Sequence, residues 1–124
     1  MELKTYFYDT YALYEIISGN PAYKKYTAGV AAITTKLNLM ELYYGLLLKY
    51  GKKKAEKYYQ EFAEYAIEID DDAIKKAMEL KQTLKNKNLS YVDCIGYTLA
   101  QQRNIKFLTG DRQFQNMSGV EYVK

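Results

Sequence analysis

Four acidic residues occupy positions in this chain where carboxylates can do chemistry. Asp9 comes directly after an apolar, aromatic run, and Asp111 follows another apolar run at a Thr-Gly-Asp turn. Glu41 and Asp93 lie within segments that have a helical pattern. Four like charges brought together would raise one another's pKa and oppose folding unless cations neutralised them. Two divalent cations match four carboxylates in charge, and Mg²⁺ prefers oxygen ligands.

Each acid also has an ordinary structural explanation. Asp9 can cap the helix that follows it, because Asp is a favoured N-cap residue. Asp93 can complete a capping box with Ser90, and Asp111 can occupy a turn, where Asp is common. Glu41 can face solvent, although no Lys or Arg lies three or four residues away to pair with it on a helix. Taken singly, the acids therefore leave both explanations open.

The composition excludes several other kinds of catalytic site. The chain has no histidine, which excludes a Ser-His-Asp triad, a Cys-His pair, histidine acid–base catalysis and His-ligated zinc. Its one cysteine, Cys94, cannot form an intramolecular disulfide and is expected to be a small buried residue. Hydrolytic chemistry in this chain would therefore depend on carboxylates and hard metal ions.

The hydrophobic periodicity predicts strands that alternate with helices. Strands are predicted at 3–8, 30–34, 66–69 and 106–109, with 121–123 as a candidate fifth strand. Helices are predicted at 10–18, 35–50, 52–65, 90–103 and from Asp70 onward, where Asp70, Asp71 and Asp72 are expected to act as a cap. This alternation indicates parallel pairing and an α/β layer architecture. Sites in such sheets form at the carboxyl ends of strands, where Asp9 and Asp111 are predicted to lie.

Length and composition predict one domain over residues 1–124 that folds without disulfides. The N-terminus lacks the layout of a secretory signal, and the longest apolar stretch, 37–48, contains Asn38 and Glu41. It is also far shorter than a membrane span, so we expect a soluble, cytoplasmic protein with no membrane partner. The net charge of +3 permits binding to a phosphate backbone but does not require it.

Lysines and tyrosines are the residues that suggest partners. Of eighteen Lys and Arg residues only Arg103 and Arg112 are arginines, and there are fifteen tyrosines. The lysines at 24–25, 52–54 and 57 could guide a nucleic acid, although a solvated helix face is the favoured explanation for each cluster. The segment 37–65 is rich in Leu and Tyr, which suit either an interface or a core.

Four segments, taken in order, carry a resemblance to a known family. They are the strand end at Asp9-Thr10, the segment NLMELYYG at 38–45, the segment SYVDCIGY at 90–97 and the segment FLTGDRQF at 107–114. With them the sequence resembles the PIN-domain ribonucleases, in particular the small toxin subunits of VapBC-type toxin–antitoxin pairs. The resemblance extends over nearly the whole chain.

The resemblance implies a three-layer α/β/α sandwich around a central parallel sheet of four to five strands. It also implies that Asp9, Glu41, Asp93 and Asp111 bind Mg²⁺, with Mn²⁺ as a substitute, and hydrolyse RNA. Asp9 and Asp93 would be the principal ligands, and Asp111 and Glu41 would complete the cage or orient water. Thr109 matches a hydroxyl position near the fourth acid and would support it. The family further implies a homodimer and an antitoxin partner.

Two other functions are compatible with parts of the pattern. A PIN-like domain could process or bind RNA without acting as a toxin. A receiver-like phosphoacceptor module also places an Asp after an apolar strand. That module expects a second acid beside the first, whereas Tyr8 and Thr10 flank Asp9. The residues therefore favour the nuclease.

Overall fold

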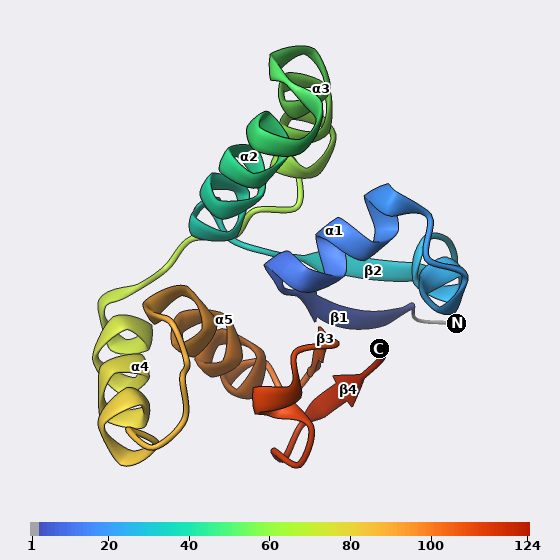
Figure 1. The fold of residues 1–124 in the computed structure, drawn as a ribbon. Helices are drawn as coiled ribbons and strands as arrows, with labels where there is room; N and C mark the ends of the chain where they lie inside the picture. The colour runs from blue at the N-terminus through green and yellow to red at the C-terminus, as the bar shows by residue number, and fades with distance from the viewer. Residues whose placement is uncertain (1–2) are drawn as a thin grey trace.

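A central sheet of four parallel strands organises the protein. The structure, a computed structural model, describes residues 3–124, so the first two residues of the predicted domain lie outside it. The strands are β1 Lys4–Tyr8, β2 Val30–Ile33, β3 Lys106–Thr109 and β4 Val120–Tyr122. They pair in the order β2-β1-β3-β4. The two central strands, β1 and β3, are far apart in the sequence (Figure 1). In their pairing Tyr8 lies opposite Leu108.

Five α-helices and two short 3₁₀ helices connect the strands. They are α1 Thr10–Ser18, η1 Pro21–Tyr26, α2 Lys36–Tyr50, α3 Lys52–Ala63, α4 Asp71–Thr83, α5 Tyr91–Gln102 and η2 Arg112–Phe114. Four of the α-helices begin at a residue whose side chain accepts a hydrogen bond from the N–H group three positions on, namely Asp9, Thr35, Asp70 and Ser90. Such caps satisfy backbone donors that the first helical turn leaves free, so the sequence itself sets these helix starts.

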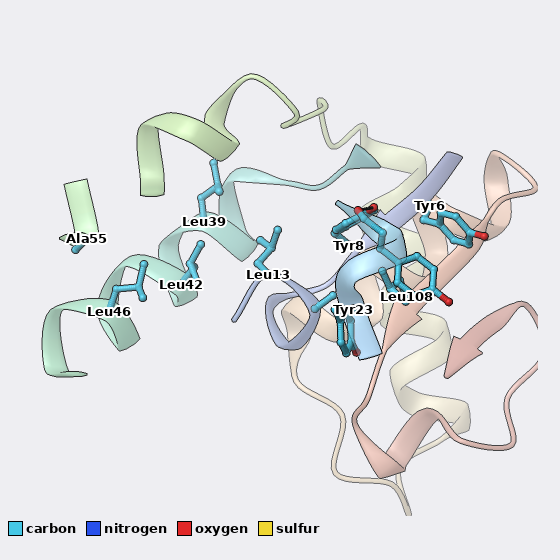
Figure 2. Packing of buried hydrophobic residues seen from close by; sticks show 11 residues of the cluster. Tyr6, Tyr8, Leu13, Tyr23, Leu39, Leu42, Leu46, Ala55 and Leu108 are labelled. Carbon is cyan, nitrogen blue, oxygen red and sulfur yellow. Dashed lines mark hydrogen bonds between the residues drawn. The ribbon is translucent and has the colours of Figure 1, made fainter. Parts of the chain in front are cut away.

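Successive residues of the central strands point to opposite faces of the sheet. Tyr6, Tyr8 and Leu108 pack on one face with residues of α1, η1 and α2. Figure 2 shows this cluster from close by, with Leu13 and Tyr23 beside the strand residues. The alternation follows from the period of two along a strand.

The second face is covered by α4 and α5. Phe7 and Phe107 stack there with their ring centroids 5.6 Å apart, and Ala73 and Ala77 of α4 are fully buried beneath them. Cys94 is buried in the same cluster, as its type predicts. Helices thus cover both faces of a parallel sheet, and the predicted three-layer α/β/α sandwich is confirmed.

The helices α2 and α3 form a hairpin that extends away from the sheet (Figure 1). Ala55 of α3 packs against the same cluster as Leu42 and Leu46 of α2. Gly45 lies where α2 meets α1, and a Cβ atom at this position would overlap the hydroxyl of Tyr14. A larger residue here would displace the Tyr14 ring, so glycine leaves room for this side chain between the two helices.

One predicted element was wrong, and one short helix was missed. Residues 66–69 do not form a strand, because after a single parallel bridge between Thr34 and Ala66 the chain leaves the sheet. The short helix η1 was not predicted, although Asn20 caps it and Pro21 opens it. None of the helices among residues 3–124 is both long enough and apolar enough to cross a bilayer.

Candidate functional site

The strand order reverses at the centre of the sheet, between β1 and β3. The chain passes from β1 to β2 on one side and then crosses to β3 on the other side. Asp9 follows β1 and Asp111 lies two residues beyond β3, so both acids occur at the carboxyl edge of adjacent strands. The Asp9 N–H group donates to the Leu108 carbonyl at 3.3 Å. Ligands of parallel α/β folds bind at such a switch point.

Asp9 is buried, with only 3% of its surface exposed. Its Oδ1 atom accepts a hydrogen bond of 2.8 Å from the Ala12 N–H group and so caps α1. Burial raises the pKa of Asp9 to about 8, and the charges of Asp93 and Asp111 add to that rise. Hydrogen bonds from Thr109 and Ala12 oppose it by lowering the pKa. A carboxyl group this desolvated is unfavourable as a lone anion, and a nearby cation would relieve the cost.

The turn after β3 connects Asp111 to the buried hydroxyl of Thr109. The Asp111 N–H group donates to Thr109 Oγ1 at 3.1 Å, and Asp111 Oδ1 accepts from the Gln113 N–H group at 3.0 Å. Gly110 separates these two residues. A Cβ atom at this position would overlap the Tyr11 ring and the Val123 carbonyl oxygen, which explains the glycine. Thr109 therefore lies between Asp9, whose pKa it lowers, and Asp111, whose backbone it holds.

Asp93 is fixed by a capping box at the start of α5. The Ser90 N–H group donates to Asp93 Oδ2 at 2.9 Å, and the Asp93 N–H group donates to Ser90 Oγ at 3.0 Å. Burial is the main cause that raises the pKa of Asp93, and the charge of Asp111 acts in the same direction. Hydrogen bonds to the carboxylate from the backbone and the side chain of Ser90 lower the pKa, as does the charge of Lys81.

Glu41 is held by a chain of polar side chains that crosses from α2 to α1. The Thr35 hydroxyl donates to Asn38 Oδ1 at 2.6 Å, and Asn38 Nδ2 donates to Thr10 Oγ1 at 3.1 Å. The Thr10 hydroxyl then donates to Glu41 Oε1 at 2.6 Å. Burial raises the pKa of Glu41, the hydrogen bond from Thr10 lowers it, and the charge of Asp93 raises it. We call this chain of hydrogen bonds the Thr35–Glu41 relay.

The structure brings all four predicted acids to one region, which we call the acidic mouth: Asp9, Glu41, Asp93 and Asp111. The charge of Asp93 raises the pKa of both Asp9 and Glu41, and that of Asp111 raises the pKa of Asp9 and Asp93. Among residues 3–124 the one ion pair joins Lys76 to Asp72 at 3.3 Å on the surface of α4, so no basic side chain pairs with the mouth.

The donors of the acidic mouth are carboxylate oxygens, which suit a hard divalent cation such as Mg²⁺ or Mn²⁺. As oriented, however, no three Asp, Glu or Cys side chains in the described part of the chain lie close enough to hold one ion. The residue types therefore fit a metal, although the side chains as they lie do not form a complete ligand set.

Three of the four acids act as caps in the structure, as their positions predicted: Asp9, Asp93 and Asp111. Exposure to solvent was the wrong explanation for Glu41, because its carboxylate is half-buried and bonded to Thr10. Capping alone does not explain why these caps converge on a desolvated mouth.

Sequence reasoning missed the polar residues that position Glu41. Asn38 is 2% exposed although it lies within an otherwise apolar run, and its type was the available signal. Thr35 could have been recognised as the N-cap of α2. Thr10 gave no signal, since its partners are distant in the sequence.

Comparisons with known proteins bear on the family and the fold of this chain. The PIN domain family matches residues 6–120 of the chain. A VapC ribonuclease of Archaeoglobus fulgidus is 34% identical over 73 residues, which cover 55% of this chain and 47% of that protein. The alignment therefore spans about half the length of this curated relative.

Solved structures show the same fold at low sequence identity. VapC20 of Mycobacterium tuberculosis, a toxin that cleaves the sarcin–ricin loop, matches with a TM-score of 0.80 and 16% identity, over 96% of this chain and 99% of that one. A toxin–antitoxin complex from Klebsiella pneumoniae matches with a TM-score of 0.73 and 21% identity, over 93% and 94%. The family match and the shared fold exclude the receiver-like alternative. This chain belongs to the PIN domain family.

Proposed function

We propose that this chain is a metal-dependent ribonuclease that hydrolyses RNA phosphodiester bonds and acts as the toxin of a toxin–antitoxin pair. The observation that carries the proposal is the convergence of four acids at the switch point of the sheet, without a basic side chain to pair with them. The partial identity to a VapC ribonuclease supports the choice of RNA as substrate.

In this proposal Asp9 and Asp93 are the principal ligands of Mg²⁺, while Asp111 and Glu41 complete the cage or orient water. When bound, divalent cations polarise the phosphate and lower the pKa of water, which favours in-line hydrolysis. The protein contributes the placement of the acids. Asp9 and Asp93 sit at helix N-termini, where the capping hydrogen bonds limit their rotation.

Supporting groups reduce the reorganisation that the ligands need. The Thr35–Glu41 relay orients the Glu41 carboxylate through the hydrogen bond from Thr10. Thr109 contacts both the Asp9 side and the Asp111 side of the mouth. Groups behind metal ligands typically change affinity or activity by about 10–100-fold. We assign Thr10 and Thr109 to this supporting role.

The proposed partners are an antitoxin protein and a second copy of this chain, in the cytoplasm. Large apolar side chains exposed on α2, among them Met40, Tyr44 and Leu48, suit a protein interface. The solved relative from Klebsiella pneumoniae is itself a toxin–antitoxin complex. Light scattering that finds only a monomer at micromolar concentration would contradict the dimer.

The test is cleavage of labelled RNA by purified protein, with Mg²⁺ and with a chelator. Asp9→Asn and Asp93→Asn should each lower the rate by at least about 100-fold, more than loss of a supporting group would. Asp71→Asn is the matched control, because Asp71 is an exposed acid in the first turn of α4. Full activity of both ligand variants, or cleavage that survives chelation, would refute the proposal.

A toxin and an RNA-processing enzyme differ in the effect that cleavage has on the cell. Sequencing of RNA ends after induction, with Asp9→Asn as control, would identify the target. Growth arrest that is relieved by a protein encoded beside this chain indicates a toxin. Cleavage of a precursor RNA without arrest indicates the processing alternative.

A further inference from the structure

Two lysines are anchored at the edge of the acidic mouth. Among the lysines of residues 3–124, Lys81 and Lys87 are the two whose Nζ atoms donate to backbone carbonyls. They donate to Leu89 at 2.6 Å and to Gln113 at 3.0 Å. These two lysines are half-buried, whereas the other lysines are exposed. They tie the connection between α4 and α5 to the regions that carry Asp93 and Asp111.

Tyr91 projects from the same edge. It is the first residue of α5, two positions before Asp93, and 65% of its surface is exposed. The Nζ atom of Lys81 lies over its ring, 5.0 Å from the centroid. The ring therefore has an ammonium group on one face and the solvent on the other.

This pair has the chemistry that the mouth itself lacks. The carboxylates offer no contact to the bases, and even with cations bound they do not hold the phosphates on either side of the cleaved bond, so a substrate strand needs further contacts close by. An exposed aromatic ring can stack on any base of a single strand, and a lysine can neutralise a phosphate. A tyrosine with this exposure contributes little to the core, so packing does not explain its position.

We infer that Tyr91 and Lys81 form the substrate-positioning contact of this chain. Tyr91 stacks on a base of single-stranded RNA beside the acidic mouth, and Lys81 binds a phosphate of the same strand. This inference rests on the proposed function. It adds a contact that positions the RNA beside the acidic mouth.

The test of the stacking contact is the affinity for a labelled single-stranded RNA, measured by fluorescence anisotropy. The measurements use the Asp9→Asn background, in which the RNA stays uncut. Tyr91→Ala should weaken binding about tenfold, a typical effect of losing one stacked base. Tyr91→Phe keeps the ring and should retain the affinity. In the active protein Tyr91→Ala should raise KM more than it lowers kcat.

A second lysine–tyrosine pair supplies the matched control. Lys54 Nζ lies 4.9 Å from the Tyr50 ring centroid, at the end of α2. Tyr50 is nine residues after Glu41, roughly 13 Å further along the helix axis. Tyr50→Ala should therefore leave RNA affinity unchanged.

The test of the phosphate contact is the salt dependence of binding. Lys81→Met should reduce the slope of log Kd against log salt concentration by about 0.7, the value for one phosphate on a single strand. Lys106 is exposed at the start of β3, the end of the strand opposite to the mouth, so Lys106→Met should leave that slope unchanged. Because Lys81 also holds the Leu89 carbonyl, circular dichroism must show a folded variant, and Lys81→Arg should keep the slope.

The outcomes separate this inference from the proposed function. A wild-type protein that cleaves RNA, while Tyr91→Ala keeps its Kd and KM, overturns the inference and leaves the nuclease intact. A protein that binds RNA through Tyr91 but never cleaves it overturns the nuclease and leaves the contact intact. A protein that does not bind RNA overturns both.

Discussion

The two halves of the acidic mouth are held in different ways. Asp93 and Asp111 are fixed by hydrogen bonds to residues two or three positions away in the sequence. Glu41 depends on Thr10, which is distant in the sequence and lies on another helix. Asp9, like Asp93 and Asp111, accepts a hydrogen bond from a residue nearby in the sequence, but its carboxyl group is far more desolvated. One half therefore follows from local sequence, and the other requires the assembled fold.

The difference also concerns electrostatics. The half formed by Asp9 and Glu41 combines burial with a relay of neutral hydroxyl and amide groups, so its charges are poorly compensated. Backbone N–H groups donate to Asp9 as well as to Asp93 and Asp111, but the half formed by Asp93 and Asp111 is less buried than Asp9 and, at Asp93, receives the field of Lys81. We expect the first half to dominate how stability responds to pH and metal.

The largest expected effect is on the pH dependence of stability. The pKa of Asp9 is raised to about 8 in the fold, whereas an unfolded Asp ionises near pH 4. Between these values the folded state holds a proton that the unfolded state has lost. This group therefore lowers the free energy of unfolding by about 1.4 kcal/mol per pH unit as the pH rises. Asp9→Asn should remove that slope in urea titrations of the metal-free protein.

Asp111→Asn is the control for this prediction in the other half of the mouth. The Asp111→Asn variant keeps the buried carboxyl of Asp9, so it should keep the slope. Asn also caps helices well, so Asp9→Asn should fold normally. A slope that Asp9→Asn leaves unchanged would contradict the burial of an uncompensated carboxyl group.

The next effect is stabilisation by metal. Mg²⁺ at about 100 times its Kd should raise the free energy of unfolding by about 2.7 kcal/mol. Because Asp9 must lose its proton to act as a ligand, the increase should be larger at pH 8.5 than at pH 6. Thermal unfolding with Mg²⁺ and with a chelator measures it. Equal stabilisation of wild type and Asp9→Asn would argue against Asp9 as a ligand.

Breaking the Thr35–Glu41 relay should cost about 2 kcal/mol of stability. Thr10→Val keeps the size of the side chain but removes the hydroxyl that joins Asn38 to Glu41, and it leaves a buried amide without its acceptor. Urea unfolding measures the loss. Thr83→Val is the matched control in an exposed part of α4, where less than about 0.5 kcal/mol is expected.

The smallest effect concerns the capping box. Ser90→Ala removes one cap hydrogen bond at the start of α5 and should cost about 1 kcal/mol. The urea midpoint of this variant should fall less than that of Thr10→Val. If the order is reversed, local caps rather than the relay dominate the stability of the mouth.

Features that depend on neighbours in the sequence could be predicted. The helix starts at Thr10, Asp71 and Tyr91 follow from capping residues, and the alternation of strands and helices predicts the layers. The four acids were identified because they follow strands or interrupt apolar runs. Local rules were sufficient for these features.

Long-range contacts account for what was missed. The relay joins Thr10 to Asn38 and Glu41, residues that only the packing of α1 on α2 brings together. The role of Gly45 depends on the hydroxyl of Tyr14, also on the other helix. The segment 66–69 has the apolar pattern of a strand, yet beyond Ala66 it has no partner in the sheet, and pattern alone does not reveal this.

The pairing of β1 with β3 has a consequence for synthesis on the ribosome. The strand that precedes Asp9 is made well before its neighbour β3, whose Leu108 lies opposite Tyr8. Domains begin to form from the N-terminus as the chain grows. Until β3 has emerged, Asp9 lacks both its neighbouring strand and Asp111. A nascent chain of this protein should therefore lack an assembled acidic mouth until β3 and the turn that carries Asp111 have emerged.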